Sequence, residues 1–198
     1  MGETKTAIYY NHNFYYDFSQ IIRADDRAIQ FGDGAYEWIR IHHGHSFGLS
    51  YHTDRLYRSM RLLGIRPVTA PDEFTEIVEV VVEESEIEEG YVKIIVTRGS
   101  DDHNFTIPAR SALQPNVLVY GKPIDLNAIE KVQSGVNCIT LDDDRGHHCD
   151  ILSLNQLNNM MARAEAQKKN CYDAVFIKDG LLTEASHSNV CIVKAGVI

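Results

Sequence analysis

Short stretches of this 198-residue chain carry residues that could bind a charged ligand. In "HTDRLYRS", Arg55 stands early in a predicted helix, where the default is a solvated side chain. Close to a helix N-terminus, a guanidinium group and free backbone N–H groups could together bind a phosphate. In "FGDGAYEWIR", a Gly-Asp-Gly turn leads into a strand with Tyr36 at its head. Tyr36 is either an edge tyrosine or a phenol directed into a site.

A further stretch, "LLTEASHSNV", places a carboxylate next to a run of polar residues. Glu184 follows a predicted hairpin strand, and Ser186, His187, Ser188 and Asn189 come after it. The ordinary interpretation is a solvated polar turn. The functional interpretation is that Glu184 pairs with the nitrogen of a heterocycle. Such a carboxylate keeps the nitrogen protonated and makes the ring an electron acceptor.

Neighbouring histidines raise the question of a metal site. "IHHGHS" contains His42, His43 and His45, and imidazoles are ligands for zinc and nickel. However, they lie at a predicted hairpin turn, and adjacent strand residues point to opposite faces. The residues of "HHCD" at 147–150 are likewise too close in sequence to converge on one ion. We therefore expect solvated turns and no metal.

The elements that must position these residues follow from hydrophobic periodicity and from turn residues. The pattern predicts hairpins over 6–18 and 35–49, helices over 52–65 and 70–90 that end at glycine, and strands at 91–99 and within 112–126. After a connector near 121–123 it predicts a strand at 135–141, a helix at 155–170, and strands at 173–180 and 188–196. The expected class is α/β in an α+β two-domain arrangement.

The expected division of the chain is an N-terminal α/β domain at 1–120, a connector at 121–125 and a C-terminal barrel-like α/β domain at 126–198. The last residues, Val197 and Ile198, are apolar and follow a turn signal. Because domain ends are usually solvated, we expect a truncated chain with an incomplete second domain.

Composition excludes several classes of function. The net charge of −9 disfavours a protein that binds nucleic acid through a basic surface. No apolar run is long enough to predict a membrane span, and the N-terminus carries no secretory pattern. The four cysteines form no C-x-x-C pair, which favours reduced thiols in a cytoplasmic protein.

The order of several motifs resembles that of the fold-type IV pyridoxal-phosphate enzymes. The motifs are "FGDGAYE", "HTDRLYRS", "VTRG", "CDILSLN", "CYDAV" and "LTEASHSNV". This family includes D-amino-acid aminotransferases, branched-chain aminotransferases and aminodeoxychorismate lyases, and the resemblance is closest to the first of these. It implies pyridoxal 5'-phosphate as cofactor, an amino acid and a 2-oxo acid as substrates, and a homodimer.

The resemblance also implies roles for individual residues. Arg55 would bind the cofactor phosphate, and Glu184 would pair with the pyridine nitrogen. Tyr36 would contact the cofactor or the substrate carboxylate. His103 matches a histidine that D-specific members place near that carboxylate. Residues that would shape the turn beneath the ring are Ser186, His187, Ser188 and Asn189.

Two positions depart from the family pattern. Leu152 in "HCDILSLNQL" stands where the family has the lysine that bonds to the cofactor and moves the substrate proton. Asp101 stands where D-specific members have an arginine, and we expect its charge to repel a substrate carboxylate. We therefore predict a transaminase whose activity this chain lacks because of Leu152. The resemblance implies a D-amino acid as its substrate.

Other hypotheses remain open. The chain could be a non-catalytic relative that binds a cofactor or a partner, or it could belong to the branched-chain or lyase branch of the family. The ordered motifs disfavour an unrelated structural domain. Whether residue 152 carries an amine separates the first two hypotheses.

Overall fold

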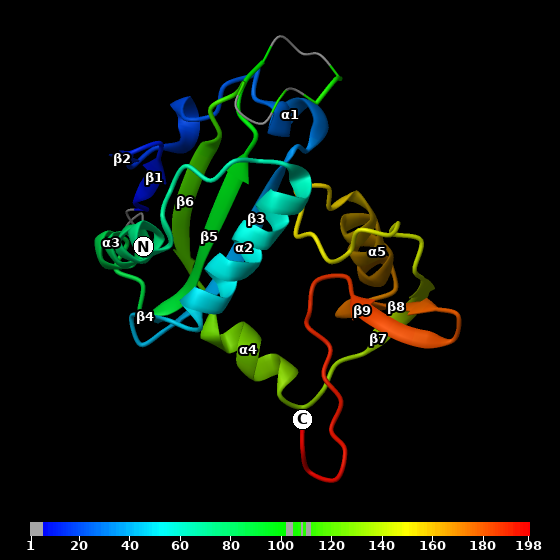
Figure 1. Cartoon of the computed structure of the whole chain (residues 1–198). Helices are drawn as coiled ribbons and strands as arrows, with labels where there is room; N and C mark the ends of the chain where they lie inside the picture. The colour runs from blue at the N-terminus through cyan, green and yellow to red at the C-terminus, as the bar shows by residue number, and fades with distance from the viewer. Residues whose placement is uncertain (1–5, 102–104, 108, 110–111) are drawn as a thin grey trace. The chain divides into compact units, whose positions relative to one another are not determined.

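The computed structural model describes residues 6–101, 105–107, 109 and 112–198. Its helices and strands form two compact units. The first unit comprises Met1–Leu126 together with Asp150–Asn155, and the second comprises Asn127–Cys149 and Gln156–Ile198. Figure 1 labels the α-helices and strands of both units. The α/β class predicted from the sequence is confirmed.

The first unit is built on one antiparallel sheet with the strand order β2-β1-β6-β5-β3-β4. Its strands are β1 (Ile8–Tyr10), β2 (Asn13–Tyr15), β3 (Gly34–His42), β4 (His45–Ser46), β5 (Glu89–Thr97) and β6 (Asn116–Pro123). Its helices are η1 (Phe18–Gln20), α1 (Arg27–Phe31), α2 (Leu49–Leu63) and α3 (Pro71–Glu84). The sequence did not predict η1 or α1.

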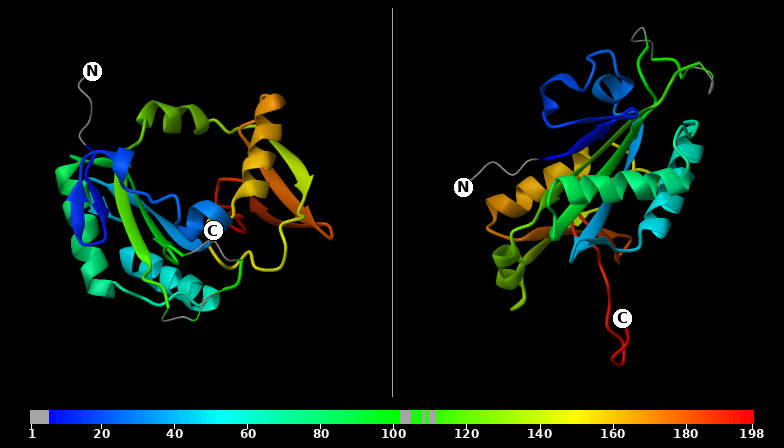
Figure 2. Two further views of the ribbon diagram at one scale, coloured as in Figure 1. Left: turned by 90° about the horizontal axis from the view of Figure 1, so that it is seen from above. Right: turned by 90° about the vertical axis from the view of Figure 1, so that its left-hand side faces the viewer.

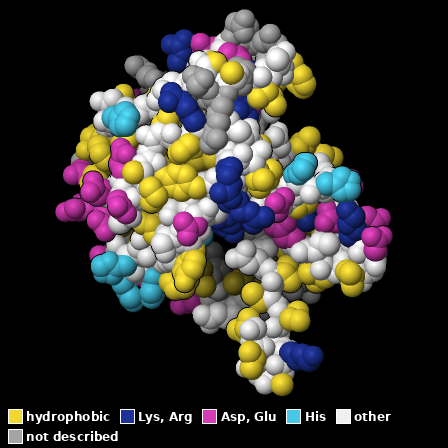
Figure 3. Space-filling model, in the orientation of Figure 1, with side chains coloured by type: hydrophobic (Ala, Val, Ile, Leu, Met, Phe, Trp, Pro, Cys, Tyr) yellow, Lys and Arg dark blue, Asp and Glu magenta, His cyan; other side chains and the backbone are white. Residues whose placement is uncertain are grey.

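The core of this unit lies between the sheet and two helices. Figure 2 shows α2 and α3 together on one face of the sheet. Leu56 and Val78 of these helices pack with Ile39 and Ile94 of the central strands, and all four are fully buried. Alternate residues of β3 point to this core, so Tyr36 and Trp38 lie on the opposite face. Acidic side chains gather over α3, as Figure 3 shows.

The second unit contains a three-stranded sheet, β7-β8-β9. Strand β7 (Cys138–Asp142) runs parallel to β8 (Asp173–Lys178), which pairs antiparallel with β9 (Leu181–Ala185). Helix α5 (Leu157–Lys168) packs through Ala162 and Ala166 against Phe176. Helix α4 (Leu126–Val132), at the boundary of the units, was not predicted.

Some predicted boundaries are wrong. Helix α3 ends at Glu84, not at Gly90, because Glu86 adopts a left-handed conformation with φ of 51°. Gly90 instead lies in β5, where a Cβ would stand 2.4 Å from the Lys122 carbonyl oxygen. Residues 121–123, expected to be a connector, are the end of β6. The division at 121–125 remains a prediction.

The strand predicted at 188–196 is also wrong. The strand that pairs with β8 is β9. Glu184 lies within β9, whereas the sequence predicted that it follows a strand. Within 188–196 the backbone forms no strand, and Ile192 and Val193 are 75% and 71% exposed. Their apolar pattern imitates a buried strand, but no strand of the second unit pairs with them among the residues described.

Candidate functional site

The segment Asp150–Asn155 brings Leu152 to the beginning of β3. The amide of Tyr36 donates a hydrogen bond to the Leu152 carbonyl oxygen at 3.0 Å, and the amide of Leu154 donates to Gly34 at 3.0 Å. Ala35 and Ser153 form an antiparallel bridge between these two bonds. Tyr36 and Leu152 therefore stand opposite each other, and opposed residues carry their side chains on the same face.

Gly34 permits this close approach. A Cβ at that position would lie 2.6 Å from the Val96 carbonyl oxygen and 2.7 Å from Leu154 Cδ1. Both separations are shorter than real Cβ contacts, and one of them involves backbone. Gly34 is therefore required for the segment that carries Leu152 to pair with β3.

We expect Gly34→Ala to displace this segment and to reduce the free energy of unfolding by about 1–3 kcal/mol, the usual cost of overpacking. Amide hydrogen exchange at Tyr36 and Leu154 should accelerate, because both amides bond across the displaced pair. Chemical denaturation and exchange mass spectrometry measure the two effects. Unchanged exchange at both amides would contradict this account of the pairing.

An ionic network fixes the Gly-Asp-Gly turn ahead of Tyr36. Asp33 accepts hydrogen bonds from Arg27 Nε at 2.8 Å and from Arg98 Nε at 2.7 Å. Burial raises the pKa of Asp33, but the bonds from Arg98 and Arg27 outweigh burial and leave the pKa below its ordinary value. Arg27 also pairs with Asp101, Nη1 to Oδ2 at 2.5 Å.

The pairing of Asp101 corrects one expectation. Its carboxylate lies against the buried guanidinium of Arg27, which compensates its charge. Simple repulsion of a substrate carboxylate by Asp101 therefore does not follow. The other residue predicted in this loop, His103, lies outside the described residues.

Arg55 is held by the buried carboxylate of Glu37, the residue that follows Tyr36 in the sequence. Its Nε and Nη2 atoms each donate to Glu37 at 2.7 Å, and His52 Nδ1 lies 2.8 Å from Glu37 Oε2. Glu37 is fully buried, whereas the Arg55 side chain is 46% exposed. The bonds to Glu37 raise the pKa of Arg55, although burial opposes the shift. Arg55 thus has a fixed orientation, and Nη1 provides further donors.

The supposed proximity of Arg55 to a helix N-terminus is wrong. Helix α2 begins at Leu49, not at His52, so Arg55 lies well inside it. At a rise of about 1.5 Å per residue, Arg55 is about 9 Å along the axis from the first residue. Free backbone N–H groups are confined to the first turn, so they do not assist Arg55.

Around Tyr36 the sheet carries aromatic rings and one amine. Trp38 stacks on Tyr91 with centroids 4.5 Å apart. Lys93 Nζ lies 5.2 Å from the ring centroids of both Tyr36 and Trp38. Burial lowers the pKa of Lys93. The face that Tyr36 shares with Leu152 is therefore aromatic and positively charged.

Within the second unit, Glu184 is oriented by Arg145. Arg145 Nη1 contacts Glu184 Oε2, while Nε and Nη2 each bond to Asp143 at 2.9 Å. The bonds from Arg145 hold the pKa of Asp143 well below its usual range, and those from Asp143 raise the pKa of Arg145. The Glu184 side chain is 49% exposed, so its carboxylate is both oriented and accessible.

A buried aspartate organises the polar turn after Glu184. Asp173 accepts hydrogen bonds from the hydroxyl of Ser186 and from the Ser188 hydroxyl at 2.7 Å and amide at 3.1 Å. Burial raises the pKa of Asp173, but the bonds from Ser186 and Ser188 give a net decrease. The predicted turn residues are thus brought together in part: Ser186 and Ser188 share Asp173, while His187 and Asn189 are exposed.

Comparison with known proteins places these features in a family. The sequence profile described as amino-transferase class IV matches residues 34–198. The chain is 40% identical over 174 residues to the D-alanine aminotransferase of Bacillus licheniformis. This match covers 88% of the chain and 60% of that protein. It is 34% identical over 191 residues to the D-alanine aminotransferase of Staphylococcus aureus (strain MSSA476). That match covers 96% of the chain and 67% of the relative.

Solved structures agree on the fold. The branched-chain aminotransferase of Thermoproteus uzoniensis with norvaline has a TM-score of 0.81 at 21% identity, and 96% of this chain and 66% of that chain are covered. A hypothetical aminotransferase from Mycobacterium tuberculosis in its PLP-bound form has a TM-score of 0.77 at 23% identity, covering 92% and 66%. The predicted fold-type IV architecture is confirmed. The chain belongs to the class IV aminotransferase family.

Proposed function

We propose that this protein is built for pyridoxal-phosphate-dependent transfer of an amino group between an amino acid and a 2-oxo acid. The observation that supports the proposal is the pairing of Tyr36 with Leu152, because the resemblance assigns both residues to the site. Relatives named D-alanine aminotransferase support a D-amino acid as substrate. The chain spans 60% of the length of the Bacillus licheniformis relative, so the activity is proposed for the family's shared region.

The side chains fit the cofactor's charged groups but not its covalent attachment. Arg55 supplies an oriented cation for a phosphate, and Glu184 supplies an oriented carboxylate for a ring nitrogen. Leu152 supplies no amine. Pyridoxal phosphate, when bound, would provide a ring that accepts electron density from the substrate. The side chains therefore fit a cofactor that is bound non-covalently.

Each residue would then have a limited role. Arg55 would hold the phosphate, and Glu37 would fix the plane of the Arg55 guanidinium group. Glu184 would keep the pyridine nitrogen protonated, with Arg145 fixing its direction. Tyr36 would contact the substrate side, and Leu152 would exclude water without moving a proton. The Ser186-His187-Ser188-Asn189 turn would support the ring.

We expect the chain to bind pyridoxal phosphate non-covalently, without a borohydride-stable adduct. The affinity should fall by about 1.5–3 kcal/mol in Arg55→Ala, the range for a hydrogen bond to a charged group. The measurement is equilibrium dialysis or an absorbance titration of the folded proteins. Arg58→Ala, one turn further along α2, is the matched control and should leave the affinity unchanged. Equal affinities for wild type and Arg55→Ala would assign the phosphate to another residue.

A second candidate function is a non-catalytic relative that binds the cofactor. The observation that favours it is Leu152 itself, because leucine has no group that accepts a proton. Both candidates predict cofactor binding, and they differ in whether the rest of the site supports catalysis once an amine is restored at residue 152. Restoring that amine is therefore the decisive experiment.

We further propose a cytoplasmic homodimer. Large apolar side chains are exposed, among them Tyr51 at 81% and Phe47 at 75%, and such surfaces favour association. No helix in the described part of the chain is long and apolar enough to cross a membrane. Sedimentation velocity should show a dimer. A monomer over the whole micromolar range would contradict the proposed assembly.

A further inference from the structure

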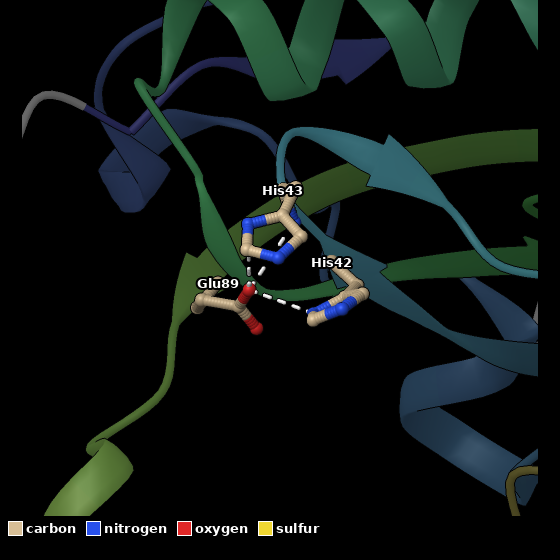
Figure 4. A group of neighbouring side chains, drawn as sticks. All are labelled: His42, His43 and Glu89. Atoms are coloured by element: carbon tan, nitrogen blue, oxygen red, sulfur yellow. Dashed lines mark hydrogen bonds and ion pairs between the residues drawn. The ribbon is translucent and has the colours of Figure 1, made fainter.

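The side chains of His42, His43 and Glu89 converge at the turn between β3 and β4. His42 Nδ1 lies 2.8 Å and His43 Nδ1 lies 3.7 Å from the same atom, Glu89 Oε1. One ligand atom from each residue lies within 4.8 Å of the others. Figure 4 shows both rings directed toward the carboxylate. Figure 3 shows histidine side chains gathered on the surface beside β4.

The backbone explains why two adjacent histidines meet. In a regular strand their side chains would point to opposite faces, which is why the sequence disfavoured a metal site. His43, however, lies beyond the end of β3 and adopts a left-handed conformation with φ of 48°. The two ring centroids are 4.1 Å apart with an interplanar angle of 42°. The turn thus brings both Nδ1 atoms to one side.

Glu89 is already oriented for a single ligand bond. Its Oε2 atom contacts Arg40 Nη2, and Arg40 also donates from Nη1 to the Gly90 carbonyl oxygen at 2.9 Å. The amide of His43 donates to Glu89 Oε1 at 3.1 Å. Arg40 therefore fixes one carboxylate oxygen and leaves the other facing the imidazoles. Such supporting contacts are typical of carboxylates that bind metals.

We propose that His42, His43 and Glu89 form a surface site for a divalent transition-metal ion, and that this ion is zinc. Zinc bonds to nitrogen and oxygen at about 2.0–2.2 Å, so tetrahedral ligands stand about 3.3 Å apart. The distances of 2.8 and 3.7 Å from Glu89 Oε1 lie on either side of this value, so small side-chain rotations suffice. Two nitrogen ligands favour zinc or nickel over magnesium or calcium.

The expected site is open and exchangeable. The side chains of His42 and His43 are 61% and 78% exposed, so water completes the coordination. The ion would tie the β3–β4 turn to the start of β5, where Glu89 stands. This role concerns the first unit alone and does not depend on the proposed transaminase activity.

The test is isothermal titration of the untagged chain, free of added cofactor, with Zn²⁺ in a buffer that does not chelate. We expect one equivalent to bind, with at least a tenfold weaker affinity in His42→Ala, His43→Ala and Glu89→Gln. Mg²⁺ and Ca²⁺ should give no heat of binding. Replacing both His147 and His148 with alanine, a matched removal of adjacent exposed histidines, should leave the affinity unchanged.

Thermal unfolding provides a second readout. Zn²⁺ should raise the melting temperature of wild type but not of Glu89→Gln, because an ion that binds the folded state stabilises it. The substituted histidines are exposed, and circular dichroism checks that each variant is folded. Zinc affinity that persists in both His43→Ala and Glu89→Gln would overturn the proposal. Affinity lost in the His147/His148 double variant would assign the ion to residues 147–150 instead.

Discussion

Replacing Leu152 with lysine is expected to raise the rate of amino-group transfer from an amino acid to the cofactor by about 10²–10⁴-fold, the usual contribution of a positioned proton-transfer group. The backbone at residue 152 is already paired with Tyr36, so the new side chain would extend on the face that Tyr36 occupies. Lys93 stands on that face, 5.2 Å from the Tyr36 ring centroid. A nearby cation favours the neutral form of a new amine, which is the form that reacts.

The measurement is release of 2-oxo acid from D-alanine, L-alanine, glutamate and leucine in the presence of pyridoxal phosphate. Leu152→Met is the matched control, since methionine has a similar volume but no amine, and it should remain at the wild-type rate. If Leu152→Lys binds the cofactor but is no faster than Leu152→Met, a lysine at this position does not complete the site. That outcome would favour the non-catalytic alternative.

Replacing Arg55 with alanine is expected to reduce the free energy of unfolding by about 3 kcal/mol, the lower end of the cost of breaking a buried ion pair, because Glu37 is fully buried but Arg55 is half exposed. Glu37 is fully buried and loses both of the 2.7 Å bonds from Arg55. His52 remains, at 2.8 Å from Glu37 Oε2, and compensates only part of the loss. Urea denaturation followed by circular dichroism measures the effect.

The neighbouring pair of Arg58 and Asp150 is the control. Its atoms are 3.1 Å apart, but its side chains are 55% and 47% exposed. Exposed pairs contribute about 0–1 kcal/mol, so Arg58→Ala should have little effect. The double variant Glu37→Gln/Arg55→Ala should recover part of the loss, because a neutral amide costs less to bury than a carboxylate. Equal losses for Arg55→Ala and Arg58→Ala would show that Glu37 does not depend on Arg55.

Local sequence signals were sufficient to predict helix ends and turns where they agree with tertiary packing. Gly64 ends α2 in the left-handed conformation, with φ of 71°, as the sequence indicated. The hairpin turn at Gly44 is also confirmed, with φ of 73°. The signals failed at Gly90 and at 188–196, because a glycine in a crowded strand resembles a helix end and an unpaired apolar segment resembles a strand.

The candidate site residues were chosen from the sequence by residue type, but the side chains that orient them were not predicted. Arg145 and Asp173 orient Glu184 and Ser186, but neither pairing was predicted, although Asp173 lies in the motif "CYDAV". One sequence feature pointed to Glu37. It is a charged residue at a position of β3 where the alternation predicts a buried apolar side chain. The convergence of His42 and His43 depends on one backbone conformation that no residue pattern specifies.

The most direct test of the central claim is a mass measurement at residue 152. Wild type and Leu152→Lys are each incubated with pyridoxal phosphate, reduced with borohydride, and digested for peptide mapping. We predict one stable adduct in the variant, on the peptide that contains residue 152, and no adduct on that peptide in wild type. A variant that binds the cofactor but carries its adduct elsewhere, or none, would contradict the claim that Leu152 occupies the family's lysine position.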